Sequence, residues 1–521
     1  MARTIEILDT TLRDGMQSEG ISYSVEDKLA IVSALDGLGI SYIEAGNPGS
    51  NPKDLEFFQA AARRPRSHAC LCAFGSTRRK GSPAEEDAGL RALLTVDAPV
   101  AVIFGKSAAY HVTEVLGCTL EENPRMIEDT VSFLRARGRR VFFDAEHFFD
   151  GYRKDPEYAL QTLEAAAAAG AERLVLCDTN GGAFMEEIRA GVERAGRIGV
   201  PLGIHCHDDC GLAAANTLAA VDAGAIHVQG TLLGFGERCG NACLATVIPD
   251  LQLKAGYACI PQGTMKSLKD VCYRVAELTN ISIPKSQPYI GRAAFAHKAG
   301  MHVDGMRKAP GSFEHVSPEA VGNERRLLLS EMSGRSALLP KIQRIAPEID
   351  RDSPLLAGIL KRLKELELAG YQFEAAEASF ELAVRKELGL YQPSFKLIGF
   401  KTIGEQVEGH IRNASAIVHV QVDERSEMTA AQGEGPVHAL DCALRKALEI
   451  FYPSLRNAHL IDYKVRVLDH QAATASRVRV LITSSDGEHI WSTVGVSQDI
   501  IQASWLALVD SIEYKLICDK E

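Results

Sequence analysis

Short apolar runs alternate with longer helical patterns along the first half of the chain. The apolar runs, each a strand candidate, cover residues 4–8, 41–44, 69–74, 100–104, 141–144, 174–177, 202–205 and 227–231. Each is followed by a segment with helical spacing, such as residues 25–38 after the first run and 157–169 after the fifth. Eight such units before Gly256 predict an α/β fold, a closed parallel (β/α)8 TIM barrel, because an open doubly wound sheet rarely needs so many.

The regular alternation ends after Gly256. Helical patterns at residues 267–278 and 354–368 flank a Gly- and His-rich stretch at residues 296–305. We therefore predict a catalytic barrel at residues 1–262 and a helical linker region at residues 263–377. Linkers usually only connect domains, but His297 and His302 suggest that this one also reaches the barrel mouth.

The last part of the chain, residues 378–521, has a third pattern. Strand candidates at 379–384, 395–402 and 415–422 lead through Gly433-Glu434-Gly435-Pro436-Val437 to a helical pattern at 438–450. A second round follows, with strands at 461–468, 477–483 and 490–496 and a helix at 498–516. The two rounds predict an α+β domain with a βββα repeat. Its two helix N-termini suit a small carboxylate ligand, although ordinary capping is the simpler explanation.

Composition agrees with a multidomain globular protein. A chain of 521 residues is too long for one ordinary core and suggests about three units. Hydrophobic residues make up 46% and charged residues 24%, which excludes a disordered chain. The 57 basic and 68 acidic residues give a net charge of −11, so neither nucleic acid nor a membrane surface is an expected partner.

The N-terminus and the cysteines indicate a reducing compartment. Residues 1–4 lead directly into an apolar strand pattern without a signal peptide, and no apolar run reaches about 18 residues. The 12 cysteines form no CxxC pair, and Cys70, Cys72 and Cys177 lie inside apolar strands. We expect a cytoplasmic protein with reduced cysteines and neither a zinc nor a disulfide framework.

Polar residues close almost every strand of the predicted barrel, at the end where TIM-barrel active sites lie. These residues are Asp9, Arg13, Asp14, Glu44, Lys106, Glu146, Asp178, Thr179, His205, His207, Glu237 and Asn241. In an extended strand, His205 and His207 project to one face and Cys206 to the other. Two imidazoles on one face are half of a metal site, but a solvated strand end would look the same.

Three motifs together resemble the DRE-TIM metallolyase superfamily. They are residues 9–17 (DTTLRDGMQ), 205–208 (HCHD) and 234–242 (GFGERCGNA). More narrowly, the chain resembles the 2-isopropylmalate, homocitrate and citramalate synthases. Residues 297–302 are similar to the linker motif of this family, and the Gly-x-Gly-Pro-Val repeat looks like its C-terminal regulatory domain. The resemblance covers nearly the whole chain.

Within that family, four segments look like the citramalate synthase branch: residues 19–28, 48–54, 104–107 and 144–152. Three positions depart from the pattern. Asn47 and the pair Ala108-Ala109 stand where the resemblance leads us to expect a bulky aromatic side chain and its neighbours, and Phe313 stands where relatives often carry Tyr. The first two changes would enlarge or reshape the acceptor pocket, and the third removes a hydroxyl group.

The resemblance implies a Claisen-type condensation in which the methyl carbon of acetyl-CoA attacks a 2-oxo acid and the thioester is then hydrolysed. For the citramalate synthase branch the acceptor is pyruvate and the pathway leads to isoleucine. The alternatives are a 2-isopropylmalate synthase acting on 2-oxoisovalerate in leucine biosynthesis and, with less support, a homocitrate synthase. A carbon–carbon lyase of the same superfamily and a catalytically dead regulatory barrel also remain open.

The resemblance also implies a divalent cation held by one carboxylate and two imidazoles. Asp14, His205 and His207 match these ligands, and Asn241 matches a fourth through its side-chain carbonyl. Barrel closure makes the seventh, eighth and first strands neighbours, which supports this grouping. Mg²⁺, Mn²⁺ and Zn²⁺ all tolerate such mixed ligation and stay open.

The remaining site residues follow from the same resemblance. Arg13 would stabilise an enolate or alkoxide oxygen, with a surface ion pair as the plain alternative. Glu146 and His302 are the acid and base candidates, and which one removes the methyl proton stays open. The residues expected to bind or surround the substrate are Arg13, Phe104, Asp144, Thr179 and Asp304. We further expect a homodimer whose C-terminal repeat binds isoleucine or, alternatively, leucine.

Overall fold

The computed structural model describes residues 3–297, 302, 305, 306, 308, 309, 311–327, 335–405, 413–468 and 476–520. The chain divides into two compact units. The first contains Met1–Ala296 and Glu314–Arg326, and the second contains His297–Phe313 and Leu327–Glu521. Among the described residues, no helix is both long and apolar enough to cross a membrane.

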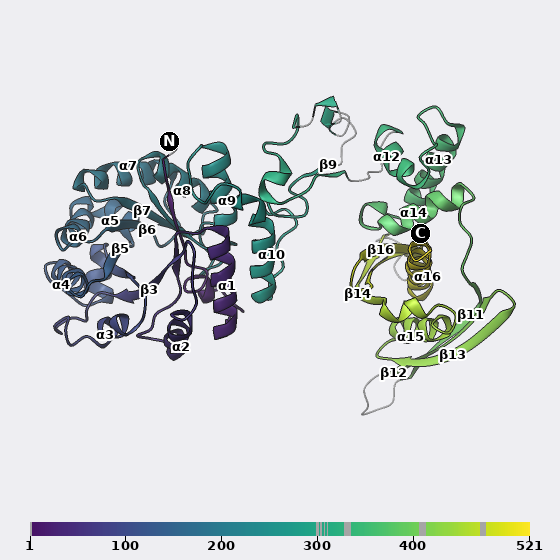
Figure 1. Ribbon diagram of the computed structural model, residues 1–521, viewed down its shortest axis with the longest axis horizontal. Helices are drawn as coiled ribbons and strands as arrows, with labels where there is room; N and C mark the ends of the chain where they lie inside the picture. The colour runs from purple at the N-terminus through teal and green to yellow at the C-terminus, as the bar shows by residue number, and fades with distance from the viewer. Residues whose placement is uncertain are drawn as a thin grey trace. The chain divides into compact units, whose positions relative to one another are not determined.

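Eight parallel strands close into a barrel in sequence order, with β8 paired to β1 (Figure 1). The strands are β1 (Glu6–Asp9), β2 (Tyr42–Glu44), β3 (Cys70–Ser76), β4 (Val100–Lys106), β5 (Arg140–Glu146), β6 (Arg173–Asp178), β7 (Leu202–Cys206) and β8 (His227–Gly230). The (β/α)8 barrel expected from the sequence is confirmed. Every predicted strand run overlaps one of these strands.

Helices surround the barrel strands (Figure 1). They are α1 (Val25–Leu38), α2 (Pro52–Ala61), α3 (Ala88–Thr95), α4 (Glu122–Ala136), α5 (Phe148–Lys154), α6 (Pro156–Ala168), α7 (Met185–Ala195), α8 (Ala213–Asp222) and α9 (Leu244–Pro249). Helix α1 shows how the sequence sets their bounds. Ser24 and Asp27 form a capping box at its start, and Gly39 ends it in a left-handed conformation with φ of 92°.

Two apolar layers stabilise the barrel. The outer layer joins the strands to the helices and is continuous around the first unit. The inner layer fills the barrel with the buried side chains of Leu8, Tyr42, Cys72, Val100, Val102 and Phe142. The buried side chains beyond this plug, at the carboxyl ends of the strands, are polar: Asp9, Glu44, Asp144, His205 and Gln229. This end of the barrel therefore has the composition of a site rather than of a core.

Residues beyond the barrel form smaller pieces. Helix α10 (Leu268–Leu278) packs on α1, and β9 (Ala296–His297) pairs with β10 (Arg326–Leu327). Helices α12 (Arg335–Ile345), α13 (Pro354–Leu368) and α14 (Glu377–Glu387) share an apolar cluster that includes Ile342, Ile359, Phe380 and Val384.

The C-terminal part contains two three-stranded antiparallel sheets, each followed by a helix (Figure 1). The first half consists of β11 (Lys396–Glu405), β12 (Asn413–Val422), β13 (Arg425–Gly433) and α15 (Pro436–Leu448). The second consists of β14 (His459–Val467), β15 (Val478–Ser485), β16 (Ile490–Ser497) and α16 (Ile500–Cys518). One apolar core joins both halves, and the predicted βββα repeat is confirmed.

Two details of this repeat correct the sequence prediction. Residues 379–384, predicted as a strand, lie in α14, and the third strand of the first half is β13. The segment SFELAV fits both a period of two and a helical spacing, and as a helix it places Phe380 and Val384 in one buried cluster. Strand β13 has mostly exposed or half-buried side chains, so it lacks an apolar pattern. The boundaries proposed at residues 262 and 377 stay predictions.

Candidate active site and metal centre

Asp14, His205 and His207 form a buried cluster with metal-ligand chemistry. One ligand atom from each lies within 4.8 Å of those of the others. His205 Nε2 lies 3.4 Å from His207 Nε2 and 3.7 Å from Asp14 Oδ2. His205 lies at the end of β7, and His207 follows it on the same face, as the alternation of side chains predicts. Cys206 points to the opposite side, into the outer apolar layer.

The protonation states of this cluster suit a cation. Burial opposes the charge of Asp14, but Arg13, His205 and His207 together lower the pKa of its carboxyl to about 2. Burial lowers the pKa of His205 to about 4, against the attraction of Asp14. Burial likewise lowers the pKa of His207. Near neutral pH the cluster is therefore one carboxylate and two neutral imidazoles, the forms that bind metals.

Asn241 lies beside this cluster. Its amide nitrogen donates to Asp14 Oδ1 at 2.9 Å and to the carbonyl of Phe235 at 3.0 Å. Its buried Oδ1 atom has no hydrogen-bond partner among the described residues, and neither has His207 Nδ1. Unsatisfied buried acceptors are rare in native proteins and call for an explanation. A bound cation or its ligands would supply one, so the residues present fit the divalent cation that the sequence suggested.

Arg13 is held between two carboxylates. Its Nε atom donates to Glu44 Oε2 at 2.5 Å and its NH1 atom to Asp14 Oδ2 at 3.0 Å. The guanidinium lies over the ring of Phe74, 3.8 Å from the centroid. Burial opposes its charge, but Glu44 and Asp14 raise the pKa of Arg13 above its usual value. The alternative that Arg13 makes a surface ion pair is wrong, because only 13% of its side chain is exposed.

Asp144 and Gln229 lie deeper in the barrel. Asp144 lies on β5 and accepts a 3.0 Å hydrogen bond from the side-chain amide of Gln229 on β8. Gln229 Oε1 in turn lies 3.0 Å from His205 Nδ1. Burial raises the pKa of Asp144, and nearby Glu44 raises it further. The substrate-binding role expected for Asp144 stays a prediction, but its observed partner is Gln229.

Glu146 ends β5 and Thr179 follows β6, at the same end of the barrel. Glu146 forms an ion pair with Lys106 at the end of β4. The backbone N–H of His147 donates to Thr179 Oγ1 at 2.8 Å, which leaves the hydroxyl hydrogen of Thr179 to be donated elsewhere. Such a donor suits the carboxylate of a 2-oxo acid. Phe104 stacks on Phe74, the ring that lies under the Arg13 guanidinium, with ring centroids 5.2 Å apart.

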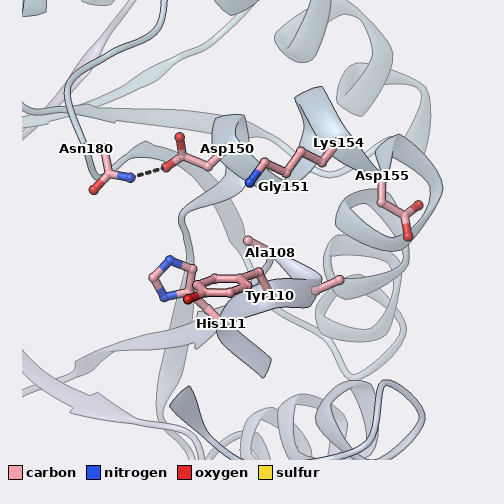
Figure 2. Close-up of a pocket in the computed structure, with 9 residues that line it drawn as sticks. Ala108, Tyr110, His111, Asp150, Gly151, Lys154, Asp155 and Asn180 are labelled. Carbon is pink, nitrogen blue, oxygen red and sulfur yellow. Dashed lines mark hydrogen bonds between the residues drawn. The ribbon is translucent and has the colours of Figure 1, made fainter. Parts of the chain in front are cut away.

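A cavity of about 280 Å³ lies beside helix α5 (Figure 2). It is lined by Ala108, Ala109, Tyr110, His111, Asp150, Gly151, Lys154, Asp155 and Asn180. Figure 2 shows Asn180 donating to Asp150, the bond measured at 2.8 Å, with the Tyr110 and His111 rings on the other wall. The two alanines that depart from the family pattern thus line this cavity, whose walls include neither the Asp14 cluster nor Arg13.

Two predicted site residues belong to the second unit. His302 is exposed, and its ring stacks on Phe313 with centroids 4.2 Å apart. Asp304 lies outside the described residues. The acid or base role of His302 and the positioning role of Asp304 stay predictions.

Sequence reasoning missed one site residue and undervalued two others. Glu44 and Lys106 were recognised as polar strand ends, but their pairing with Arg13 and Glu146 was not. Gln229 was missed altogether, because a glutamine inside an apolar strand gives no signal of chemistry. The register of parallel β7 and β8, which pairs His205 with Gln229, would have revealed it.

Comparison with known families gives matches along most of the chain. The HMGL-like family matches residues 4–271. A homocitrate synthase post-HMGL domain-like family matches residues 289–369, and the LeuA allosteric (dimerisation) domain matches residues 374–516.

Curated relatives align with nearly the full chain. An (R)-citramalate synthase of Aquifex aeolicus is 48% identical, over 100% of this chain and 99% of its own. An (R)-citramalate synthase of Geobacter sulfurreducens is 49% identical, over 98% of this chain and 97% of its own. A probable 2-isopropylmalate synthase of Methanopyrus kandleri is 31% identical, over 98% of each. Among solved structures, the hydroxymethylglutaryl-CoA lyase of Pseudomonas aeruginosa is 21% identical and covers 56% of this chain and 97% of its own, with a TM-score of 0.47.

Proposed function

The chain belongs to the HMGL-like family and, within it, to the (R)-citramalate synthases, and from this premise we propose how its barrel joins acetyl-CoA to pyruvate. The reaction forms a carbon–carbon bond between the acetyl methyl carbon and C2 of pyruvate. Water then cleaves the thioester, and (R)-citramalate and CoA leave. The observation that carries this proposal is the convergence of Asp14, His205 and His207 next to Arg13 in one buried cluster at the strand ends.

Asp14, His205 and His207 would hold a divalent cation, with the Asn241 side-chain carbonyl as a fourth ligand. When bound, the cation polarises the keto group of pyruvate and makes C2 electrophilic. The ligand set of two nitrogens and one or two oxygens supports Mg²⁺, Mn²⁺ or Zn²⁺. Arg13 neutralises negative charge that develops on the acceptor oxygen, and the Thr179 hydroxyl donates to the pyruvate carboxylate.

Glu146 and His302 share the proton transfers. One of them removes a proton from the acetyl methyl group, and the resulting carbon nucleophile attacks C2 of pyruvate. The C2 oxygen then takes up a proton, and hydrolysis expels CoA as the thiol. The ion pair with Lys106 orients the Glu146 carboxylate for proton transfer. If the His302→Ala variant condensed substrates at nearly the wild-type rate, the assignment to His302 would be wrong.

The deciding experiment is a panel of 2-oxo acids assayed with acetyl-CoA by release of free CoA thiol. We expect a strong preference for pyruvate. Preference for 2-oxoisovalerate would instead identify a 2-isopropylmalate synthase, and preference for 2-oxoglutarate a homocitrate synthase. Cleavage of a 3-hydroxyacyl-CoA without any need for acetyl-CoA would favour a lyase, and absence of all turnover a dead barrel.

The LeuA domain match supports a homodimer regulated by an amino acid, with isoleucine as the first candidate and leucine as the second. Such regulation would place the enzyme at the entry to isoleucine synthesis. A chain that ends at Gly389, and so retains α14, should lose inhibition by isoleucine. Unchanged sensitivity would contradict regulation by this domain, and sedimentation of the full chain as a monomer would contradict the dimer.

A further inference from the structure

Gln229 connects the candidate metal cluster to the opposite side of the barrel interior. It is fully buried on β8, where it bonds His205 on the neighbouring β7 and Asp144 on β5. Strand β5 pairs with β4 and β6, whereas β8 pairs with β7 and β1, so the bond to Asp144 crosses the barrel rather than following the sheet. Both bonds measure 3.0 Å between their nitrogen and oxygen atoms.

The polarity of this chain of bonds is fixed at one end. An amide side chain offers two hydrogens at its nitrogen and only acceptor sites at its oxygen. Oδ1 of Asp144 accepts, so Gln229 turns its nitrogen toward Asp144 and its oxygen toward His205. His205 must then carry its hydrogen on Nδ1. Its Nε2 atom, which faces Asp14 and His207, is left with a lone pair.

His207 lacks such a partner. Its buried Nδ1 atom has no hydrogen bond among the described residues, so no protein group there selects its tautomer. The two histidines of the cluster thus differ. Gln229 sets the tautomer of His205 before any ligand binds, whereas the tautomer of His207 is not set in this way. Partners that fix a ligand histidine are known to change metal affinity substantially when removed.

We propose that Gln229 is a positioning residue that, oriented by Asp144, fixes the Nε2-ligating tautomer and the ring orientation of His205. This rests on the cation site of the proposed function. It assigns Asp144 a task in organising the site, in addition to the contact with substrate expected from the sequence. Asp144 serves here as an acceptor, which an ionised carboxylate must be, because it has no hydrogen to donate.

The first test measures Mn²⁺ affinity of the full-length protein, stripped with a chelator, by isothermal titration calorimetry without substrates. Gln229→Met keeps the side-chain length and removes both hydrogen bonds, and should weaken binding by about 10- to 100-fold. Asn216→Leu is the matched control. Asn216 is a buried amide on α8 that donates to the carbonyl of Ala183 and is not among the hydrogen-bond partners of the cluster in the described part of the chain, so its loss should lower thermal stability but leave Mn²⁺ affinity unchanged.

The second test exchanges the two polar partners. The double variant Gln229→Glu with Asp144→Asn keeps the total charge and both side-chain lengths. The new amide at position 144 can donate to the new carboxylate at position 229, and that carboxylate can still accept from His205 Nδ1. Its Mn²⁺ affinity should return to within about threefold of wild type. Tight binding by Gln229→Met, or failure of the double variant to bind when it melts at the wild-type temperature, overturns the inference. A wild-type protein that binds no Mn²⁺ contradicts the cation site itself, whereas a preference for another 2-oxo acid contradicts only the proposed acceptor.

Discussion

At the scale of single residues, the barrel mouth holds several of its charges in buried or mostly buried ion pairs. Glu44 is fully buried and accepts from both Arg13 and Thr10, with Thr10 Oγ1 at 2.6 Å. Removing one partner of a buried pair is costly because it leaves the other charge without compensation. An exposed pair contributes little by comparison.

The Glu44→Ala variant should therefore lose about 3–5 kcal/mol of stability, since Arg13 would lose one of its two ion-pair partners, Glu44 and Asp14. Asp222→Ala is the control, because the Arg189–Asp222 pair is 46% and 63% exposed and its loss should cost less than about 1 kcal/mol. Urea unfolding, followed by far-UV circular dichroism, measures the free energy of unfolding of both variants. Equal losses in the two variants would show that Glu44 does not compensate Arg13.

Glu6 predicts a pH dependence at the other end of the barrel. Its carboxylate accepts hydrogen bonds from Arg173 at 2.9 and 2.8 Å. Burial alone would raise the pKa of Glu6, but His227 and Arg173 outweigh it and lower the pKa from 4.5 to about 2. A lowered pKa means that the folded state favours the ionised form. The stabilisation is present above pH 4.5 and is lost as the pH falls through 2.

Glu6→Gln should accordingly cost about 2 kcal/mol at pH 7, after allowance for the partial exposure of the carboxylate. Melting temperatures of wild type and variant, measured between pH 7 and pH 2.5, should converge as the pH falls below 4.5. A gap of constant size over this range would contradict the assignment.

Residue types and the family resemblance together revealed part of the candidate site. Asp14, His205, His207 and Asn241 were expected because they match the ligand set that the resemblance implies and close neighbouring strands, and the structure brings them together. The task of Gln229 depends on Asp144, 85 residues earlier in the chain, and on the register of β7 with β8. Such a contact has no local pattern, so the sequence does not display it.

At the scale of elements, the packing of α5 on the segment after β4 holds the strand end that carries Glu146 and His147. Gly151 makes this approach possible. A β-carbon there would lie 2.3 Å from the Ser107 carbonyl oxygen and 2.8 Å from Ala108 Cα, both backbone atoms that cannot rotate away.

Gly151→Ala should displace α5, cost about 1–3 kcal/mol and reduce turnover, because α5 begins directly after His147. Gly196→Ala is the control, since an added β-carbon there meets nothing within 4 Å, and its effect should stay within about 0.5 kcal/mol. Thermal melting and the condensation assay measure the two effects. A Gly151→Ala protein as stable and active as the control would show that α5 adjusts freely.

Elements were predictable where burial gives a distinct pattern. Parallel barrel strands are covered on both faces and read as continuous apolar runs, so all eight were recognised. Strand β13 has mostly exposed or half-buried side chains and was missed, whereas α14 was mistaken for a strand because its apolar residues fit two periods. Local patterns fail where tertiary packing, rather than periodicity, decides the element.

At the scale of the whole molecule, α14 links two apolar clusters of the second unit. Phe380 and Val384 belong to the cluster of α12 and α13. Ser379 bonds the other way, donating to Asp510 on α16 at 2.8 Å and accepting from the Val494 N–H on β16 at 3.0 Å. A cut at the proposed boundary of residue 377 would remove α14 from both.

A chain ending at Ala376 should therefore be cleaved by protease within α12 and α13 at least about tenfold faster than a chain ending at Gly389, because loss of buried Phe380 alone costs about 3 kcal/mol. Limited proteolysis followed by mass spectrometry locates and times the cleavage. Equal rates would mean that α12 and α13 are stable without α14.

The pairing of β1 with β8 also sets the order of events while the chain is being made. It brings Asn241 to 2.9 Å from Asp14, 227 residues earlier. At ribosomal speed these residues emerge about 10–45 s apart, and throughout that interval β1 has no partner on its closing edge. The newly made chain is therefore expected to complete the proposed cation site only after the last barrel strand has left the ribosome. A chain stalled before that strand would expose the edge of β1 to other nascent chains, and aggregation rather than metal starvation would be its first failure.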